Sequence, residues 1–135
     1  MAAPLFNNLK IATINLRSIN SSEQTGRTAI NKFEFLVQKG YDLLLLTEVK
    51  GYSNARKNQI KSFLNMHSKH QYVIEFNSSR TSRGTAIAYR KVISPKILDI
   101  KKFECENIMS MDMEINLTKI RVICVYAPND AGQKS

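Results

Sequence analysis

The stretch YDLLLLTEVK, from Tyr41 to Lys50, decides the fold class of this chain. Its four consecutive leucines, residues 43–46, form a short apolar run that is typical of a strand buried on both faces. One acidic residue, Glu48, follows the run. Open α/β sheets carry their functional groups at the carboxyl ends of such strands, so Glu48 is a candidate site residue. Taken alone, the stretch favours the simpler interpretation, in which the carboxylate only meets solvent where the strand ends.

The residues before this strand predict a βαβ unit. KIATINL, residues 10–16, has the alternation of a largely buried strand. A polar loop is expected over residues 17–26, followed by an amphipathic helix over 27–39 with Gly40 just beyond its end. A strand, a helix and a second strand joined by short links predict two parallel strands in one sheet.

The rest of the chain predicts one more helix and then strands. Ser53 is the expected N-cap of a helix over residues 54–65. The expected strands cover residues 72–76, 85–90, 97–103, 108–115 and 119–126. The first two of these should form an antiparallel hairpin across a polar turn at residues 77–84.

This order of elements predicts an α/β fold, with a βαβ unit followed by mostly antiparallel strands and with helices on one face. A single sheet of six or seven strands built this way would have its other face largely bare. All-apolar strands need cover on both faces. We therefore expect the chain to belong to a larger fold or to need a partner.

Length and composition favour one globular domain. The chain has 135 residues, of which 43% are hydrophobic and 23% charged. Residues 1–8 are expected to be a loose leader, and residues 9–135 a single, apparently incomplete domain. No apolar run approaches the roughly 18 residues that a membrane span requires, and no signal peptide is recognised. These features favour an intracellular location, nuclear or cytoplasmic.

The cysteines and histidines give no metal site. Cys105 and Cys124 lie in apolar contexts without CxxC spacing, so buried free thiols in a reducing compartment are favoured over a disulfide. His67 and His70 have a spacing that lets two histidines share a helix face. The helix is expected to end before His70, however, and no third ligand is evident.

The positive charge is concentrated in the middle of the chain. The net charge is +9, and residues 50–102 hold twelve Lys or Arg against two acidic residues, Glu75 and Asp99. The remaining residues hold eight basic and nine acidic side chains. This concentration predicts one positive surface, for which nucleic acid is the first partner to consider. A basic face that only contacts solvent is the alternative.

Four segments in one order resemble a known superfamily. They are KIATINLRSI with Asn15, YDLLLLTEV with Glu48, SRGTAIAYRK at residues 82–91, and VICVYAPN with Tyr126 and Asn129. In this order and spacing they resemble the endonuclease/exonuclease/phosphatase superfamily. They look most like the N-terminal half of the apurinic-type endonuclease domain of non-LTR retrotransposons. The resemblance covers about residues 9–130.

The resemblance implies a Mg²⁺-dependent DNA endonuclease, with Mn²⁺ as an alternative ion. Glu48 corresponds to the metal-binding glutamate of the family. Asn15 corresponds to the asparagine that orients groups around the scissile phosphate, and Tyr126 to the tyrosine that bonds a phosphate oxygen. Asn129 matches a frequent asparagine. These residue types suit the chemistry, because Mg²⁺ takes oxygen ligands and often only one or two carboxylates.

The resemblance also implies a four-layer α/β sandwich, in which each half supplies one sheet and this chain matches the first half. The family places an Asp-x-Asn motif and a Ser-Asp-His motif after the strand that ends in Tyr126, and neither occurs here. The chain alone is therefore expected to be inactive. Its expected partners are DNA and a complementary C-terminal half, or another chain that covers the exposed sheet face.

Two other functions stay open. The chain is alternatively a non-catalytic relic that binds nucleic acid or protein, with Arg80 and Arg83 on a basic turn as candidate DNA contacts. The second alternative is half of a phosphatase for a small molecule or a lipid, because the same superfamily includes such enzymes. The basic segment and the YAPN ending favour DNA.

Overall fold

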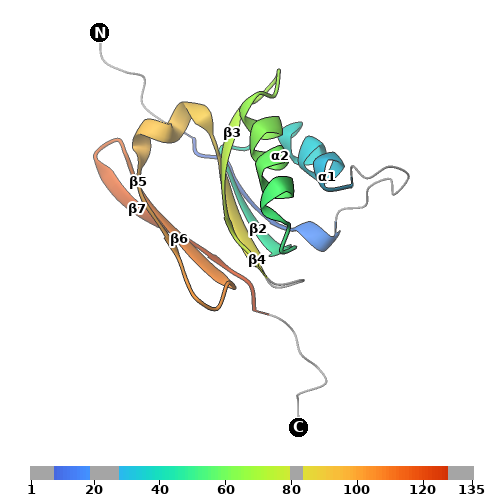
Figure 1. Cartoon of the computed structure of the whole chain (residues 1–135). Coiled ribbons are helices and arrows are strands. Elements are labelled where there is room, and N and C mark those ends of the chain that lie inside the picture. Colours follow the sequence, from blue (N-terminus) through green and yellow to red (C-terminus); the bar gives the residue numbers. More distant parts are fainter. Residues whose placement is uncertain (1–7, 19–27, 80–83, 128–135) are drawn as a thin grey trace.

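The computed structural model describes residues 8–18, 28–79 and 84–127. The elements are β1 (Ile11–Asn15), η1 (Leu16–Ser18), α1 (Thr28–Val37), β2 (Leu43–Val49), α2 (Asn54–Asn65), β3 (Tyr72–Asn77), β4 (Gly84–Arg90), η2 (Lys91–Lys96), β5 (Ile97–Lys102), β6 (Ile108–Ile115) and β7 (Thr118–Val125). Figure 1 shows two sheets packed face to face, with both α-helices on the outer side of one of them. In the described part of the chain, no helix is long and apolar enough to cross a membrane.

A four-stranded sheet has the order β1-β2-β4-β3. Strand β1 is parallel to β2, whereas β4 is antiparallel to both β2 and β3. The predicted βαβ unit and the predicted hairpin of β3 and β4 are thus confirmed. Helix α2 begins after Ser53, whose hydroxyl accepts the Arg56 N–H at 3.1 Å, as the sequence predicts.

The run of four leucines fills two different cores. Leu44 and Leu46 lie in the core between the four-stranded sheet and the helices. Leu43 and Leu45 lie in the core between the two sheets. Because successive side chains of a strand point to opposite faces, a strand covered on both faces needs apolar residues at every position.

The expectation of a single sheet with a bare face is wrong. Strands β5, β6 and β7 form a separate three-stranded sheet that packs on the face opposite the helices. The 3-10 helix η2, which contains Pro95, separates β4 from β5, and its Ile93 is buried between the two sheets. The chain thus contributes to two sheets, not one. The predicted α/β class, with helices on one face, is confirmed.

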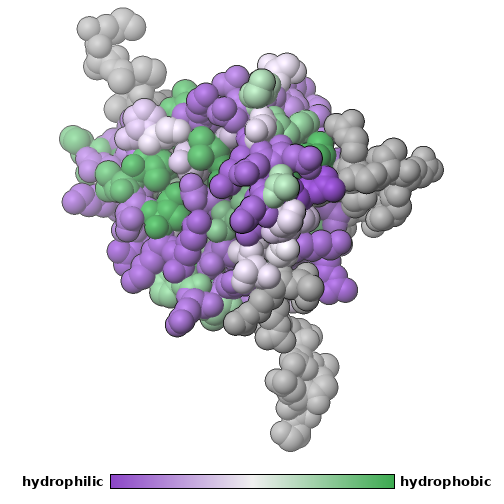
Figure 2. All heavy atoms as spheres, in the orientation of Figure 1, coloured by the Kyte–Doolittle hydropathy of each residue, from purple (hydrophilic) through white to green (hydrophobic). Residues whose placement is uncertain are grey.

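Part of the exposed apolar surface lies on the three-stranded sheet. Its exposed side chains include Leu98, Ile123 and Val125, each slightly more than half exposed. Figure 2 shows hydrophobic residues gathered on the side of the molecule where Figure 1 places this sheet. The helical side is mainly hydrophilic in this view.

The two thiols differ, and the prediction for one of them is wrong. Cys124 is buried and its Sγ donates to the Leu46 carbonyl oxygen at 3.5 Å. Burial raises the pKa of this thiol to about 11. Cys105 is exposed, because it lies in the turn between β5 and β6, outside the strand that its apolar context suggested.

Substitution of Gly84 by alanine is expected to destabilise the chain by about 1–3 kcal/mol or more. A Cβ at this position would lie 2.1 Å from the Ser78 Cβ and 2.6 Å from the Val49 carbonyl oxygen. The second contact is with backbone, which a side-chain rotation cannot relieve. Urea unfolding followed by circular dichroism measures the change, and a midpoint equal to that of the unmodified chain would contradict the close approach.

Candidate functional site

The carboxyl ends of β1 and β2 meet at one edge of the four-stranded sheet. Asn15 is the last residue of β1 and pairs with Thr47 of β2 in parallel register. Glu48 follows Thr47 directly. The sequence placed both candidate residues at strand ends, and the structure brings those ends together.

Glu48 lies in a β-bulge. Thr47 pairs with Thr85 and Val49 pairs with Gly84, so Glu48 has no partner of its own in the β2–β4 ladder. Its φ is +50°, a conformation that residues with a Cβ rarely adopt and that costs on the order of 1–3 kcal/mol. Bulges commonly redirect a side chain near functional sites. Glu48 therefore stands at an irregular position of β2, where its backbone is strained.

Both carboxylate oxygens of Glu48 have partners. The Tyr126 hydroxyl donates a hydrogen bond to Oε1. The Arg17 Nη1 atom lies 3.6 Å from Oε2. The Glu48 side chain is only 11% exposed, whereas the Arg17 side chain is 69% exposed. The phenol contact is thus enclosed, and the guanidinium contact is open to solvent.

Asn15 lies in the same group through Arg17. The Arg17 N–H donates to Asn15 Oδ1 at 2.9 Å, in the local turn that Asn residues often form at the end of a strand. Arg17 therefore connects the two residues: its backbone N–H contacts Asn15, and its guanidinium contacts Glu48. Sequence reasoning missed Arg17. The one sequence feature that could have pointed to Arg17 is its position two residues after Asn15, at the end of a predicted strand.

Tyr126 reaches Glu48 from the other sheet. It follows β7, and its N–H donates to the Asn107 carbonyl oxygen at 2.9 Å in the turn between β5 and β6. Glu106 in this turn has a φ of +63°. Its carboxylate accepts the Ser79 N–H at 3.0 Å and also accepts from the Ser79 hydroxyl. These contacts connect the backbone at Tyr126 to the end of β3.

Two further side chains join the same turn to the four-stranded sheet. Asn77 Nδ2 donates to the carbonyl oxygens of Phe103 at 3.0 Å and Ile108 at 3.1 Å. Thr85 Oγ1 donates to the Glu106 carbonyl oxygen at 3.1 Å. Asn77 and Glu106 were not among the residues predicted for the site. Their partners lie 21 to 31 residues away, so no local pattern shows them.

The residues at this edge fit a hard divalent cation. The oxygen donors are the Glu48 carboxylate, the Asn15 amide and the Tyr126 phenol, with no thiol or imidazole among them. Within residues 8–18, 28–79 and 84–127, no group of three or more His, Cys, Asp or Glu side chains is close enough to hold a metal ion. Mg²⁺ commonly uses one or two carboxylates and completes its shell with water, so one buried carboxylate is compatible with it.

Three candidate DNA contacts cannot be located. Arg80, Arg83 and Asn129 lie outside the described residues. Described basic residues of segment 50–102 lie at both ends of the four-stranded sheet. Lys50 follows β2 at the candidate site, whereas Arg90 lies at the other end of β4, where it pairs with Tyr72. Seven strand residues separate the two ends by roughly 20 Å.

Comparisons with known proteins place the fold. No protein-family model and no curated protein matches the sequence. The structure is similar to a crystal structure of D. rerio TDP2 humanized by 14 mutations, with a TM-score of 0.64 and 17% sequence identity. The match covers 93% of this chain and 49% of that chain, so this chain spans about half the length of the TDP2 chain. TDP2 has the endonuclease/exonuclease/phosphatase fold, and this chain forms a partial α/β sandwich of that fold.

Proposed function

We propose that this chain is the metal-binding part of a Mg²⁺-dependent DNA endonuclease of the non-LTR retrotransposon type. The observation that carries the proposal is the convergence of Asn15, Glu48 and Tyr126 on one edge, with Glu48 held in a strained bulge. The likeness to TDP2 supports a fold used for DNA-processing phosphodiesterases. The four sequence segments described above support the retrotransposon type.

The contacts and the family resemblance together support a role for each residue. Glu48 would hold the divalent ion, since it is the enclosed carboxylate of the group. When bound, Mg²⁺ polarises the phosphodiester and stabilises the leaving oxygen. The Tyr126 hydroxyl fixes the Glu48 carboxylate from one side. Asn15 is a neutral amide, which donates a hydrogen bond to a phosphate oxygen without adding charge near the ion.

The chain alone is expected to bind the ion and DNA without cutting DNA. The Asp-x-Asn and Ser-Asp-His motifs of the family are not in its sequence, and these supply the general base and a phosphate-binding histidine. We propose that a complementary half carries them. Supercoiled plasmid incubated with the purified chain and Mg²⁺ or Mn²⁺ should stay supercoiled. Efficient nicking that disappears in Glu48→Ala would contradict this expectation.

Non-catalytic nucleic-acid binding is the second candidate, and the net charge of +9 favours it. Fluorescence anisotropy with a labelled duplex separates the two. Under the endonuclease proposal, Mg²⁺ should strengthen binding in the unmodified chain but not in Glu48→Ala. Binding that depends steeply on salt and not at all on Mg²⁺ would favour the second candidate.

Substitution of Arg17 by alanine is expected to raise the affinity for Mn²⁺ by up to about fivefold. The guanidinium of Arg17 neutralises Glu48 in the structure, and a bound cation must displace it. An ion pair this exposed contributes only about 0–1 kcal/mol, so the gain is limited. Isothermal titration calorimetry measures it. Lys119→Ala is the control, because it removes one exposed positive charge on β7. An equal gain in Lys119→Ala would assign the effect to net charge alone.

A further inference from the structure

A second concave site lies at the opposite end of the four-stranded sheet. It has a volume of about 210 Å³ and lies where β3 begins and β4 ends. Its lining residues are His67, Ser68, Lys69, His70, Gln71, Arg90, Lys91 and Val92. We call it the basic pocket. Roughly 20 Å of strand separates it from Glu48.

The charges around the basic pocket favour an anion. Lys69, Arg90 and Lys91 line it, and none of the described residues that line it is acidic. Two carboxylates that do not line the pocket pair with residues that do. Asp42 lies 3.5 Å from Arg90, with a side chain only 10% exposed, and Glu34 lies 3.0 Å from His67. The lining therefore presents more positive than negative charge to a molecule that enters.

His70 contributes a buried nitrogen that lacks a partner. Its Nδ1 atom is buried and has no hydrogen-bond partner among the described residues. The other ring nitrogen, Nε2, lies against Gly40, where an added Cβ would be 3.2 Å away. Burial lowers the pKa of this imidazole, and the charges of Arg90, Lys69 and His67 lower it further. A buried polar nitrogen without a partner lowers the stability of the folded chain. Binding of a ligand that accepts its hydrogen bond would remove this cost and would therefore be favoured.

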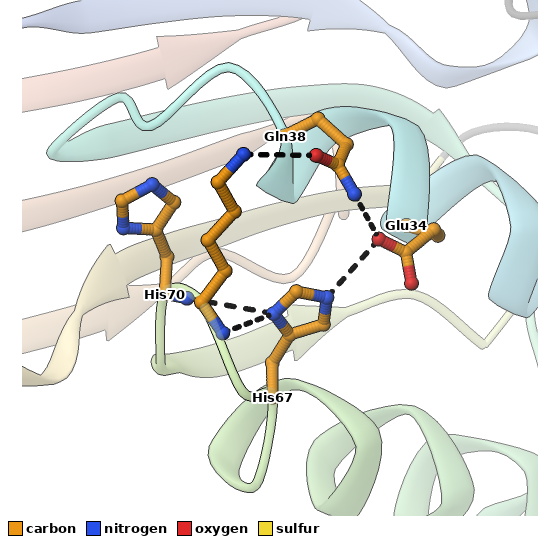
Figure 3. A network of polar contacts seen from close by, with 5 residues as sticks. Glu34, Gln38, His67 and His70 are labelled. Atoms are coloured by element: carbon orange, nitrogen blue, oxygen red, sulfur yellow. Dashed lines mark hydrogen bonds and ion pairs between the residues drawn. The ribbon is translucent and has the colours of Figure 1, made fainter.

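The walls of the pocket are held in place before any ligand binds. Figure 3 shows His67 at the centre of a network that joins this segment to α1. The N–H groups of Lys69 and His70 donate to His67 Nδ1 at 3.1 and 3.4 Å. His67 Nε2 therefore donates to Glu34, and Lys69 Nζ donates to Gln38 Oε1 at 3.4 Å. Little backbone conformational entropy would therefore be lost when a ligand binds here.

We propose that the basic pocket binds a phosphate group. A phosphate offers several charged acceptor oxygens at once, which matches an ammonium, a guanidinium and an imidazole around one small volume. Lys69, Arg90 and Lys91 would donate charge-assisted hydrogen bonds to the phosphate oxygens. A hydrogen bond from His70 Nδ1 to the same phosphate would give this buried nitrogen a partner. The proposal does not depend on metal binding at Glu48, because the two sites lie at opposite ends of the sheet.

Titration of the ¹⁵N-labelled chain with inorganic phosphate tests the proposal. Saturable chemical-shift changes are expected at residues 68–71 and 90–92. Titration with sodium chloride at the same ionic strength is the control and should not produce them. Lys91→Ala should weaken the binding by about tenfold, since it removes one charge-assisted contact. Lys119→Ala removes the same charge from β7 and should leave the affinity unchanged. Shifts that grow linearly, or that chloride reproduces, would overturn the proposal.

A second titration identifies the source of the phosphate. A short DNA duplex, added without divalent metal, is titrated into the phosphate-saturated chain. Displacement of phosphate by the duplex, lost in Lys91→Ala, assigns the pocket to a nucleic-acid backbone. Phosphate that stays bound assigns it to a free phosphate or phosphomonoester. If the Lys91→Ala and Lys119→Ala variants bind phosphate equally, the basic pocket is not the site.

Discussion

Substitution of Glu48 by alanine is expected to lower the affinity of the chain for Mn²⁺ by at least about 100-fold. Glu48 is the enclosed carboxylate at the edge where Asn15 and Tyr126 converge. Without it, a divalent ion would keep only neutral oxygen ligands there. Isothermal titration calorimetry of the purified chain measures the loss. An affinity within about threefold of the unmodified chain would remove Glu48 from the metal site.

Two other variants separate the role of the carboxylate from the role of the backbone. Glu114→Ala removes a carboxylate from β6 and should leave the Mn²⁺ affinity unchanged. Glu48→Gly removes the carboxylate and also relieves the strain at a φ of +50°. Glu48→Gly should be more stable than Glu48→Ala by about 1 kcal/mol, because glycine adopts this conformation at no steric cost. Both Glu48 variants should fail to bind the ion.

Substitution of Phe33 by alanine is expected to destabilise the chain by about 3–5 kcal/mol. The Phe33 side chain is fully buried on the face of α1 that packs against the four-stranded sheet. The substitution removes the ring and leaves a cavity that the surrounding side chains fill only in part. Urea unfolding measures the change, with the slope of the transition compared between the two proteins.

Phe35→Ala is the matched control, two residues further along the same helix. Its ring is 51% exposed, so its removal should cost less than about 1 kcal/mol. The two variants lose the same atoms from the same element. Besides burial, they differ in one contact, because Lys39 Nζ lies 4.9 Å from the centroid of the Phe35 ring. Equal destabilisation by both would mean that α1 packs with a different face.

Most elements were predictable, because their signals are local. The end of α2 at Asn65 and both bounds of β6 agree with the prediction. Helix α1 is shorter than the predicted 27–39 and ends at Val37. Gly40, predicted just beyond the helix, does adopt a φ of +69° and donates its N–H to the Val37 carbonyl oxygen at 3.1 Å.

The division into two sheets was not predictable from strand patterns. Alternating side chains show that a segment is a strand, and they do not show which sheet it joins. Met109, Met111 and Met113 alternate along β6 and are all buried between the sheets. That alternation is equally compatible with a strand of a single sheet.

The candidate site was predicted in its residues and not in its geometry. Asn15 and Glu48 stand at strand ends, and the family resemblance added Tyr126. The bulge at Glu48 depends on how β2 pairs with β4, so the positive φ has no local signal. Arg17 is an exposed basic residue near the start of the chain, and only the folded structure places its guanidinium beside Glu48.

The hydrogen bond between Tyr126 and Glu48 joins residues 78 positions apart in the chain. Contacts this distant in sequence carry a large loop-closure entropy, and we expect this one to form late in folding, after the local hairpins β3–β4 and β6–β7. An ion held by Glu48 in this arrangement would bind the folded chain and not the unfolded one. At an ion concentration 100 times its Kd, such linkage adds about 2.7 kcal/mol to the free energy of unfolding. The rise in melting temperature with ion concentration would then report binding to the folded chain, in which the two sheets are docked.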